Sequence, residues 1–92
     1  MEEQPKYYVY ILKCKDGTFY TGYTNNLNRR MVMHDSGKGA KYTRGRGPFQ
    51  LVYYQTFPTK EEAMQAEYQI KQLGRKQKEQ LVQTYQEGIK SS

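Results

Sequence analysis

The order of apolar and polar residues predicts two strands joined by a tight turn near the start of the chain. Aromatic and β-branched residues are concentrated at residues 6–13 and 18–24, and an Asp-Gly pair lies between these segments. This arrangement is typical of a β-hairpin. Residues 49–57 are similarly rich in β-prone residues, so we expect a third strand there. Residues 1–5 offer little to bury and are expected to fray.

The length of the hairpin loop decides which tyrosines share a face of the sheet. A two-residue loop would pair Lys13 with Tyr20, which places Tyr10 and Tyr20 on opposite faces. A three-residue loop that ends at a left-handed Gly17 would pair Leu12 with Tyr20 instead. Tyr10 and Tyr20 would then share a face. The residue pattern leaves both registers open.

A first helix is predicted at residues 27–36, after N-cap candidates at residues 24–26 and before two glycines. A helical period brings four of its residues onto one inward stripe, namely Leu27, Arg30, Met31 and His34. An arginine and the only histidine therefore interrupt an otherwise apolar face. Either the arginine extends to solvent and the histidine is a hydrogen-bonded core residue, or both belong to a site.

A second helix is predicted to begin after Thr59, because Thr59 and Glu62 have the spacing of a capping box, and to end at Gly74. Glu67 falls at the border of its apolar face. A carboxylate there needs a cation, a metal ion or hydrogen-bond donors. Lys71, four residues later, offers the simplest partner, which is an ion pair on the helix surface.

Two basic segments could meet an anion. A last helix is expected at residues 76–87. The helix dipole repels the cations near its start, which are Arg75, Lys76 and Lys78. The glycine-rich residues 37–48 cannot build a core, but they carry side chains that suit phosphates and stacked bases, namely Lys38, Lys41, Tyr42, Arg44 and Arg46. A solvated helix surface and a mobile loop are the alternatives.

Composition limits the class of protein. Ninety-two residues are enough for one domain, and the net charge of +6 favours a polyanionic partner, with nucleic acid ahead of a membrane surface. Cys14 is the only cysteine, which excludes an intramolecular disulfide and a cysteine-based metal cluster. No apolar run approaches the roughly 20 residues of a membrane span, and residues 1–5 lack the apolar core of a signal peptide. We therefore expect a cytoplasmic protein.

Several of these features occur together in one known superfamily. The segments Val9-Tyr10-Ile11 and Tyr20-Thr21-Gly22, followed by Arg30 and a helical Glu67, resemble the GIY-YIG nucleases, and among them the small free-standing members. The resemblance covers residues 7–81 and depends on the even spacing of Tyr10, Tyr20 and Arg30. It implies an α+β fold of the α/β sandwich kind, with a three-stranded antiparallel sheet flanked by helices in the order β-β-α-β-α-α. We expect one domain over residues 1–92, with an ordered core at residues 6–87.

The resemblance also implies an activity, which is divalent-metal-dependent hydrolysis of phosphodiester bonds in nucleic acid. DNA is favoured over RNA as the substrate. The cleavage could be structure-specific and serve repair or recombination. Carried over by position, the catalytic residues would be Tyr10, Tyr20, Arg30, His34 and Glu67. Glu67 would hold Mg²⁺ or Mn²⁺, and Gly22 would allow close approach at the nucleic-acid-binding surface. One tyrosine would orient and deprotonate the attacking water, and the other would contact phosphate. No protein partner is indicated.

The chain also departs from the pattern of the superfamily. Thr21 replaces an isoleucine, and no asparagine follows Asn28, although family members often have one in the last helix. Glu79 lies near that position. These departures favour an alternative, a non-catalytic nucleic-acid-binding module that retains the fold. A weaker alternative is a subunit whose activity depends on a partner.

Overall fold

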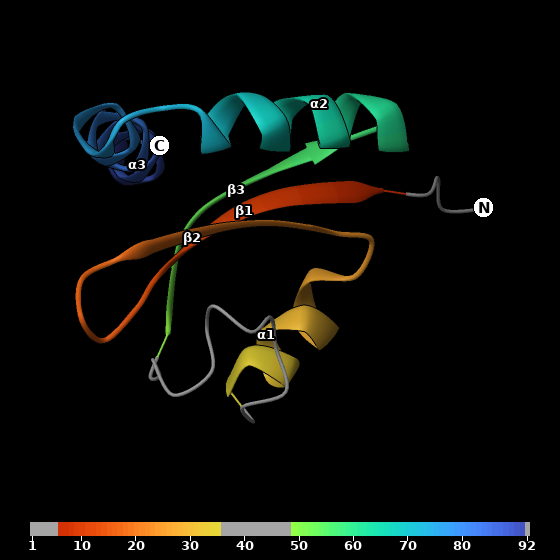
Figure 1. The fold of residues 1–92 in the computed structure, drawn as a ribbon, viewed down its shortest axis with the longest axis horizontal. Helices are drawn as coiled ribbons and strands as arrows, with labels where there is room; N and C mark the ends of the chain where they lie inside the picture. The colour runs from red at the N-terminus through yellow and green to blue at the C-terminus, as the bar shows by residue number, and fades with distance from the viewer. Residues whose placement is uncertain (1–5, 36–48, 92) are drawn as a thin grey trace.

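The computed structural model describes residues 6–35 and 49–91 and contains a three-stranded antiparallel sheet with helices on both faces (Figure 1). The elements are β1 (Tyr7–Lys13), β2 (Phe19–Thr24), α1 (Leu27–Asp35), β3 (Gln50–Phe57), α2 (Lys60–Lys71) and α3 (Arg75–Ser91). β1 lies between β2 and β3. The predicted α+β fold and its β-β-α-β-α-α order are thus confirmed. None of the described helices is long and apolar enough to cross a membrane.

The hairpin between β1 and β2 has the three-residue loop. The amide of Gly17 donates to the carbonyl of Cys14 over 2.9 Å, and Gly17 has a φ of +86°. Leu12 pairs with Tyr20, so this register confirms the second of the two predicted alternatives. Since alternate residues of a strand point to the same face, Tyr10 and Tyr20 share one face of the sheet.

Local hydrogen bonds explain where α1 and α2 begin. Asn26 Oδ1 accepts from the amide of Arg29 over 3.1 Å, which makes Asn26 the N-cap of α1. Thr59 Oγ1 accepts from the amide of Glu62 over 3.2 Å, and the Glu62 carboxylate also contacts this hydroxyl at 3.2 Å. The predicted helix start at the Thr59 cap is confirmed.

The boundary between α2 and α3 corrects the prediction. α2 already ends at Lys71, while Gly74 accepts the first helical bond of α3 from the amide of Lys78 over 3.0 Å. Gln77 Oε1 in turn accepts from the amide of Gly74 over 3.0 Å. Gly74 therefore begins α3. The last helix also continues past its expected end at residue 87 to residue 91, because Gly88 costs a helix only about 1 kcal/mol.

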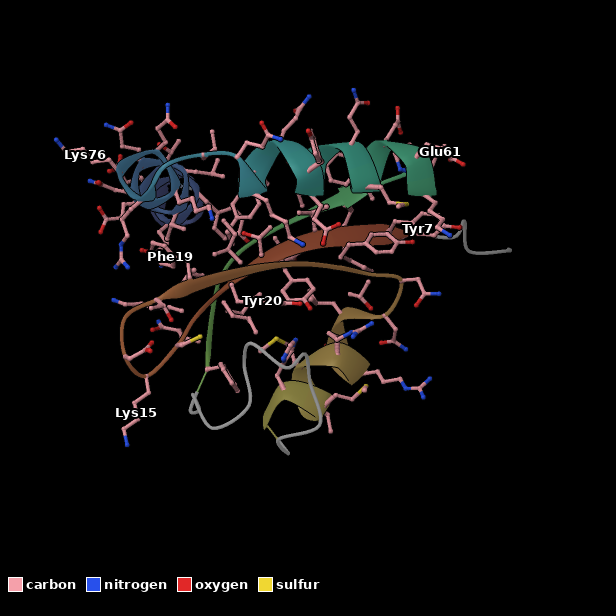
Figure 2. The ribbon with its side chains drawn as sticks, in the orientation of Figure 1. Tyr7, Lys15, Phe19, Tyr20, Glu61 and Lys76 are labelled. Atoms are coloured by element: carbon pink, nitrogen blue, oxygen red, sulfur yellow. The ribbon has the colours of Figure 1, made fainter. Side chains whose placement is uncertain are left out.

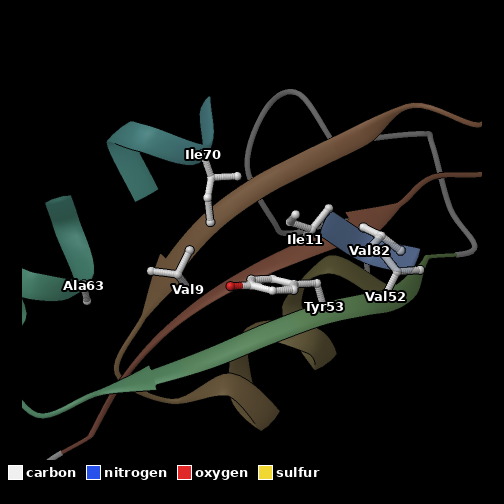
Figure 3. Close-up of a cluster of buried hydrophobic side chains, with 7 residues drawn as sticks. All are labelled: Val9, Ile11, Val52, Tyr53, Ala63, Ile70 and Val82. Atoms are coloured by element: carbon white, nitrogen blue, oxygen red, sulfur yellow. The ribbon is translucent and has the colours of Figure 1, made fainter. Parts of the chain in front are cut away.

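The two faces of the sheet are covered by different helices. α2 and α3 lie on one face and α1 on the other (Figure 1). The main apolar cluster lies on the α2 and α3 face and is formed by Val9, Ile11, Val52, Tyr53, Ala63, Ile70 and Val82 (Figure 3). Thr21, which pairs with Ile11, is 4% exposed, and its hydroxyl has no hydrogen-bond partner among the described residues.

Candidate functional site

A buried tyrosine and a buried histidine form the centre of the α1 face. Tyr10 on β1 and His34 on α1 are each 1% exposed, and the Tyr10 hydroxyl lies 3.1 Å from His34 Nε2. The rings of Tyr20 and Phe49 lie edge-to-face against His34, with centroid separations of 5.5 Å and 5.7 Å. Figure 2 shows Tyr20 pointing from β2 toward α1. His34 is thus a hydrogen-bonded core residue that also belongs to the predicted site.

Gly22 lies directly beneath the ring of Tyr10. The two residues pair across β1 and β2, and Gly22 is buried. A Cβ added at Gly22 would overlap the Tyr10 hydroxyl and would lie 2.5 Å from Cζ. The glycine therefore allows the close approach of the Tyr10 ring, so it supports the site from below.

Charges from other elements act on the Tyr10 hydroxyl. Burial raises the pKa of Tyr10 well above its ordinary value, and nearby Tyr20 raises the pKa further. The positive charge of Arg30 opposes this shift, while the negative charge of Glu67 adds to it. Tyr20 and His34 thus contact Tyr10 directly, whereas Arg30 on α1 and Glu67 on α2, which covers the opposite face of the sheet, act on Tyr10 through their charges. Tyr20, Arg30 and Glu67 are partly exposed, in contrast to Tyr10 and His34.

Glu67 has the partner that its place on the helix predicts. Its Oε2 lies 3.3 Å from Lys71 Nζ, and the side chains of Glu67 and Lys71 are 22% and 53% exposed. The described residues contain no group of three or more histidine, cysteine or acidic side chains that could surround a metal ion. Glu67 alone nevertheless fits Mg²⁺, which is held by one or two carboxylates and keeps several waters.

Arg75 contacts the hairpin between β1 and β2, which the sequence pattern did not predict. Its Nη2 donates to the carbonyl of Gly17 over 2.7 Å, and its guanidinium lies 4.9 Å from the centroid of the Phe19 ring. Its Nε also pairs with Glu79 at 3.5 Å. Arg75 thus anchors the hairpin loop to α3, and its contact with nucleic acid stays a prediction. Glu79, near the position of the missing asparagine, is engaged in this anchor.

The other predicted basic residues divide into two groups. Lys76 is exposed on α3 (Figure 2), and Lys78 is partly exposed on the same helix. The predicted contacts in the glycine-rich segment lie outside the described residues; these are Lys38, Lys41, Tyr42, Arg44 and Arg46. Phe49 contacts His34, but the sequence pattern placed it only in a strand and not in the site. The signal that could have indicated the contact was an aromatic residue directly after the glycine-rich segment.

Comparison with known proteins is consistent with this arrangement. The family described as the GIY-YIG catalytic domain matches residues 6–80. The chain is 66% identical over 76 residues to the UPF0213 protein BH0048 of Halalkalibacterium halodurans, covering 83% of this chain and 81% of the relative. It is 60% identical over 83 residues to a UPF0213 protein of Oceanobacillus iheyensis, covering 90% and 94%.

Two solved structures have a similar fold. The solution NMR structure of the UPF0213 protein BH0048, from Bacillus halodurans, has a TM-score of 0.58 at 63% identity, covering 86% of this chain and 84% of that one. The solution NMR structure of the protein EF2693 from E. faecalis has a TM-score of 0.62 at 45% identity, covering 94% and 92%. The family match spans more than half of the chain and includes all of the candidate catalytic residues. The chain belongs to the GIY-YIG family.

Proposed function

We propose that the protein is a divalent-metal-dependent endonuclease that hydrolyses phosphodiester bonds in DNA. The observation that carries the proposal is the contact of Tyr10, Tyr20 and His34 on the α1 face, where the Tyr10 hydroxyl lies 3.1 Å from His34 Nε2 and the Tyr20 ring lies 5.5 Å from the His34 ring. A phenol, a guanidinium and a carboxylate are groups that phosphoryl chemistry uses, and Tyr20, Arg30 and Glu67 would supply them. Cleavage of branched or nicked DNA in repair or recombination, in the cytoplasm, is part of the same proposal.

The two tyrosines have different parts in this proposal. Tyr10 is 1% exposed and burial raises its pKa, so its hydroxyl can donate to His34 but is not accessible to an attacking water. Tyr20 is partly exposed and packs against the same histidine. We therefore assign contact with the attacking water to Tyr20. Tyr10 and His34 position the Tyr20 ring from beneath, which differs from the phosphate contact that we expected for the second tyrosine.

In the proposed reaction the Tyr20 oxygen orients the attacking water by accepting a hydrogen bond from it, and the water loses its proton to solvent. The water oxygen forms a bond to phosphorus, the bond from phosphorus to the leaving oxygen breaks, and that oxygen takes a proton from solvent. Arg30 offers a planar fork of donors to the phosphate oxygens, which gain negative charge as the new bond forms.

Glu67 is the residue that would hold Mg²⁺ or Mn²⁺, and the bound ion would stabilise negative charge on the reacting phosphate. The ion pair with Lys71 does not prevent this role. Exposed pairs four residues apart on a helix contribute about 0.3–0.5 kcal/mol, so the Glu67 carboxylate can exchange Lys71 for another cation at small cost.

The test is a cleavage assay with labelled single-stranded, duplex, flapped and four-way-junction DNA, each with Mg²⁺, Mn²⁺ or EDTA. We expect metal-dependent cleavage that falls about 100-fold or more in Tyr20→Phe, Arg30→Ala and Glu67→Gln. Tyr68→Phe and Glu61→Gln are matched controls on the exposed surface of α2 and should cleave normally. Binding without metal-dependent cleavage of any substrate would refute the proposal.

That refuting result would favour the second candidate, a non-catalytic nucleic-acid-binding module. The specific observation behind it is Glu79, which lies near the position where relatives often carry an asparagine and pairs with Arg75 rather than offering a neutral amide. In that case Glu67→Gln would leave DNA affinity unchanged, whereas Lys76→Ala would weaken it.

A further inference from the structure

An open groove of about 480 Å³ lies next to the proposed site and on the same face of the sheet. Its walls include Tyr8 and Tyr54 from the strands and residues 25–28 at the start of α1. Tyr8 is two residues from Tyr10 on β1, and Tyr54 pairs with Tyr10 across β1 and β3. Alternation along β1 directs Tyr8 and Tyr10 to the α1 face, and Tyr54 on the edge strand β3 lies between Tyr8 and Tyr85 of α3. The groove thus lies beside Tyr10, whose ring contacts that of Tyr20.

The ring of Tyr54 is held in place and still accessible. It contacts Tyr8 at a centroid separation of 6.3 Å and Tyr85 at 6.0 Å, with interplanar angles of 53° and 63°. Neither contact is a parallel stack. Tyr54 remains 39% exposed. A ring fixed by two neighbours loses little freedom when a flat ligand stacks on it.

The opposite wall offers amides and no negative charge. The side chains of Asn25 and Asn28 are exposed and make no hydrogen bond within the described structure, while Asn26 is occupied as the N-cap of α1. An asparagine amide both donates and accepts, and it can form a bidentate contact with the edge of a base. No acidic residue lines the described groove, so nothing there repels a nucleotide.

We propose that this groove binds one unpaired nucleobase of the DNA strand that is being cut, stacked on Tyr54 and contacted at its edge by Asn25 or Asn28. The base must be unpaired because a paired base within a duplex has both faces covered by its neighbours. The inference rests on the proposed function, since it places the groove beside the reacting phosphate. It predicts that the protein selects DNA with single-stranded or extruded nucleotides next to the cleavage site.

The test is equilibrium binding in EDTA, where no cleavage occurs, with two fluorescent probes that carry the same number of phosphates. One probe is a hexamer of deoxyadenylate, and the other is the corresponding abasic hexamer. Tyr54→Ala should weaken binding of the adenylate hexamer about five- to 100-fold, the range expected for one stacked base. Tyr68→Ala, which removes an exposed tyrosine from α2, should bind both probes as the wild-type protein does.

Tyr54→Phe should bind the adenylate hexamer normally, since it keeps the ring, and circular dichroism would show whether each variant is folded. Asn25→Ala together with Asn28→Ala should weaken binding of adenylate but not of the abasic probe. The inference is overturned if the wild-type protein binds both probes equally, or if folded Tyr54→Ala binds the adenylate hexamer normally. A protein that fails to cleave DNA but loses adenylate binding in Tyr54→Ala would refute the endonuclease and retain the groove.

Discussion

Replacing Gly22 by alanine should damage the protein through the ring of Tyr10. The added Cβ would lie 2.5 Å from Tyr10 Cζ, and ordinary contacts begin at 3.4 Å, so the ring must retreat by the difference of 0.9 Å. Overpacking of this kind costs about 1–3 kcal/mol. The same movement stretches the 3.1 Å contact between the Tyr10 hydroxyl and His34 Nε2, which adds about 1 kcal/mol.

The free energy of unfolding should therefore fall by about 2–4 kcal/mol in Gly22→Ala. In a domain of this size each kcal/mol lowers Tm by about 4–8 °C, which circular dichroism measures directly. If the protein cleaves DNA, activity should also fall by about 100-fold, because a shift of about 1 Å beneath the reacting groups has that effect.

A double-mutant cycle separates this overlap from a general intolerance of alanine. In the Tyr10→Leu background the ring is gone, so Gly22→Ala should cost less than about 0.5 kcal/mol. Gly88→Ala is the control, because a Cβ there meets nothing within 4 Å and alanine should stabilise α3 by about 0.5–1 kcal/mol. Wild-type stability of Gly22→Ala, or an equal penalty in both backgrounds, would refute the explanation.

Three other predictions test features described above. Thr21→Val should raise the free energy of unfolding by about 1–2 kcal/mol, because it removes a buried hydroxyl that has no partner in the described parts of the chain. Thr24→Val should lower the free energy of unfolding, since that hydroxyl bonds with the backbone of Asn26, and urea denaturation distinguishes the two outcomes. Arg75→Ala should destabilise the protein by about 1 kcal/mol. An unchanged Tm together with a weaker salt dependence of DNA binding would contradict its anchoring role. The folded state holds the pKa of Tyr10 above 10, so the free energy of unfolding should decline as the pH rises beyond 10. Below pH 10, Tyr10 should not affect it. Urea titrations at several pH values should show a weaker decline in Tyr10→Phe.

Features that depend on neighbours in sequence could be predicted. The cap at Thr59 follows from its spacing to Glu62, and the three-residue loop was one of two registers that the position of Gly17 allowed. The partner of Glu67 was also predictable, since it is only four residues away.

Features that depend on distant segments could not be predicted from local patterns. Arg75 contacts a carbonyl 58 residues earlier in the chain, and no local pattern distinguishes such an anchor from a free cation at the start of a helix. The burial of Tyr10 and His34 likewise depends on how α1 packs against the sheet, because periodicity indicates a face but not its depth. The different exposure of Tyr10 and Tyr20 therefore emerged only from the structure.

The alternation of side chains along β1 has a consequence for protein engineering. Val9 and Ile11 belong to the apolar cluster beneath α2 and α3, while Tyr8 and Tyr10, on the other face, belong to the groove and the site. If the groove binds a nucleobase as proposed, substitutions at Tyr8 would vary ligand preference with little effect on the α2 and α3 cluster. A library that keeps Val9 and Ile11 fixed could redesign specificity from a single strand, with folding monitored independently of binding.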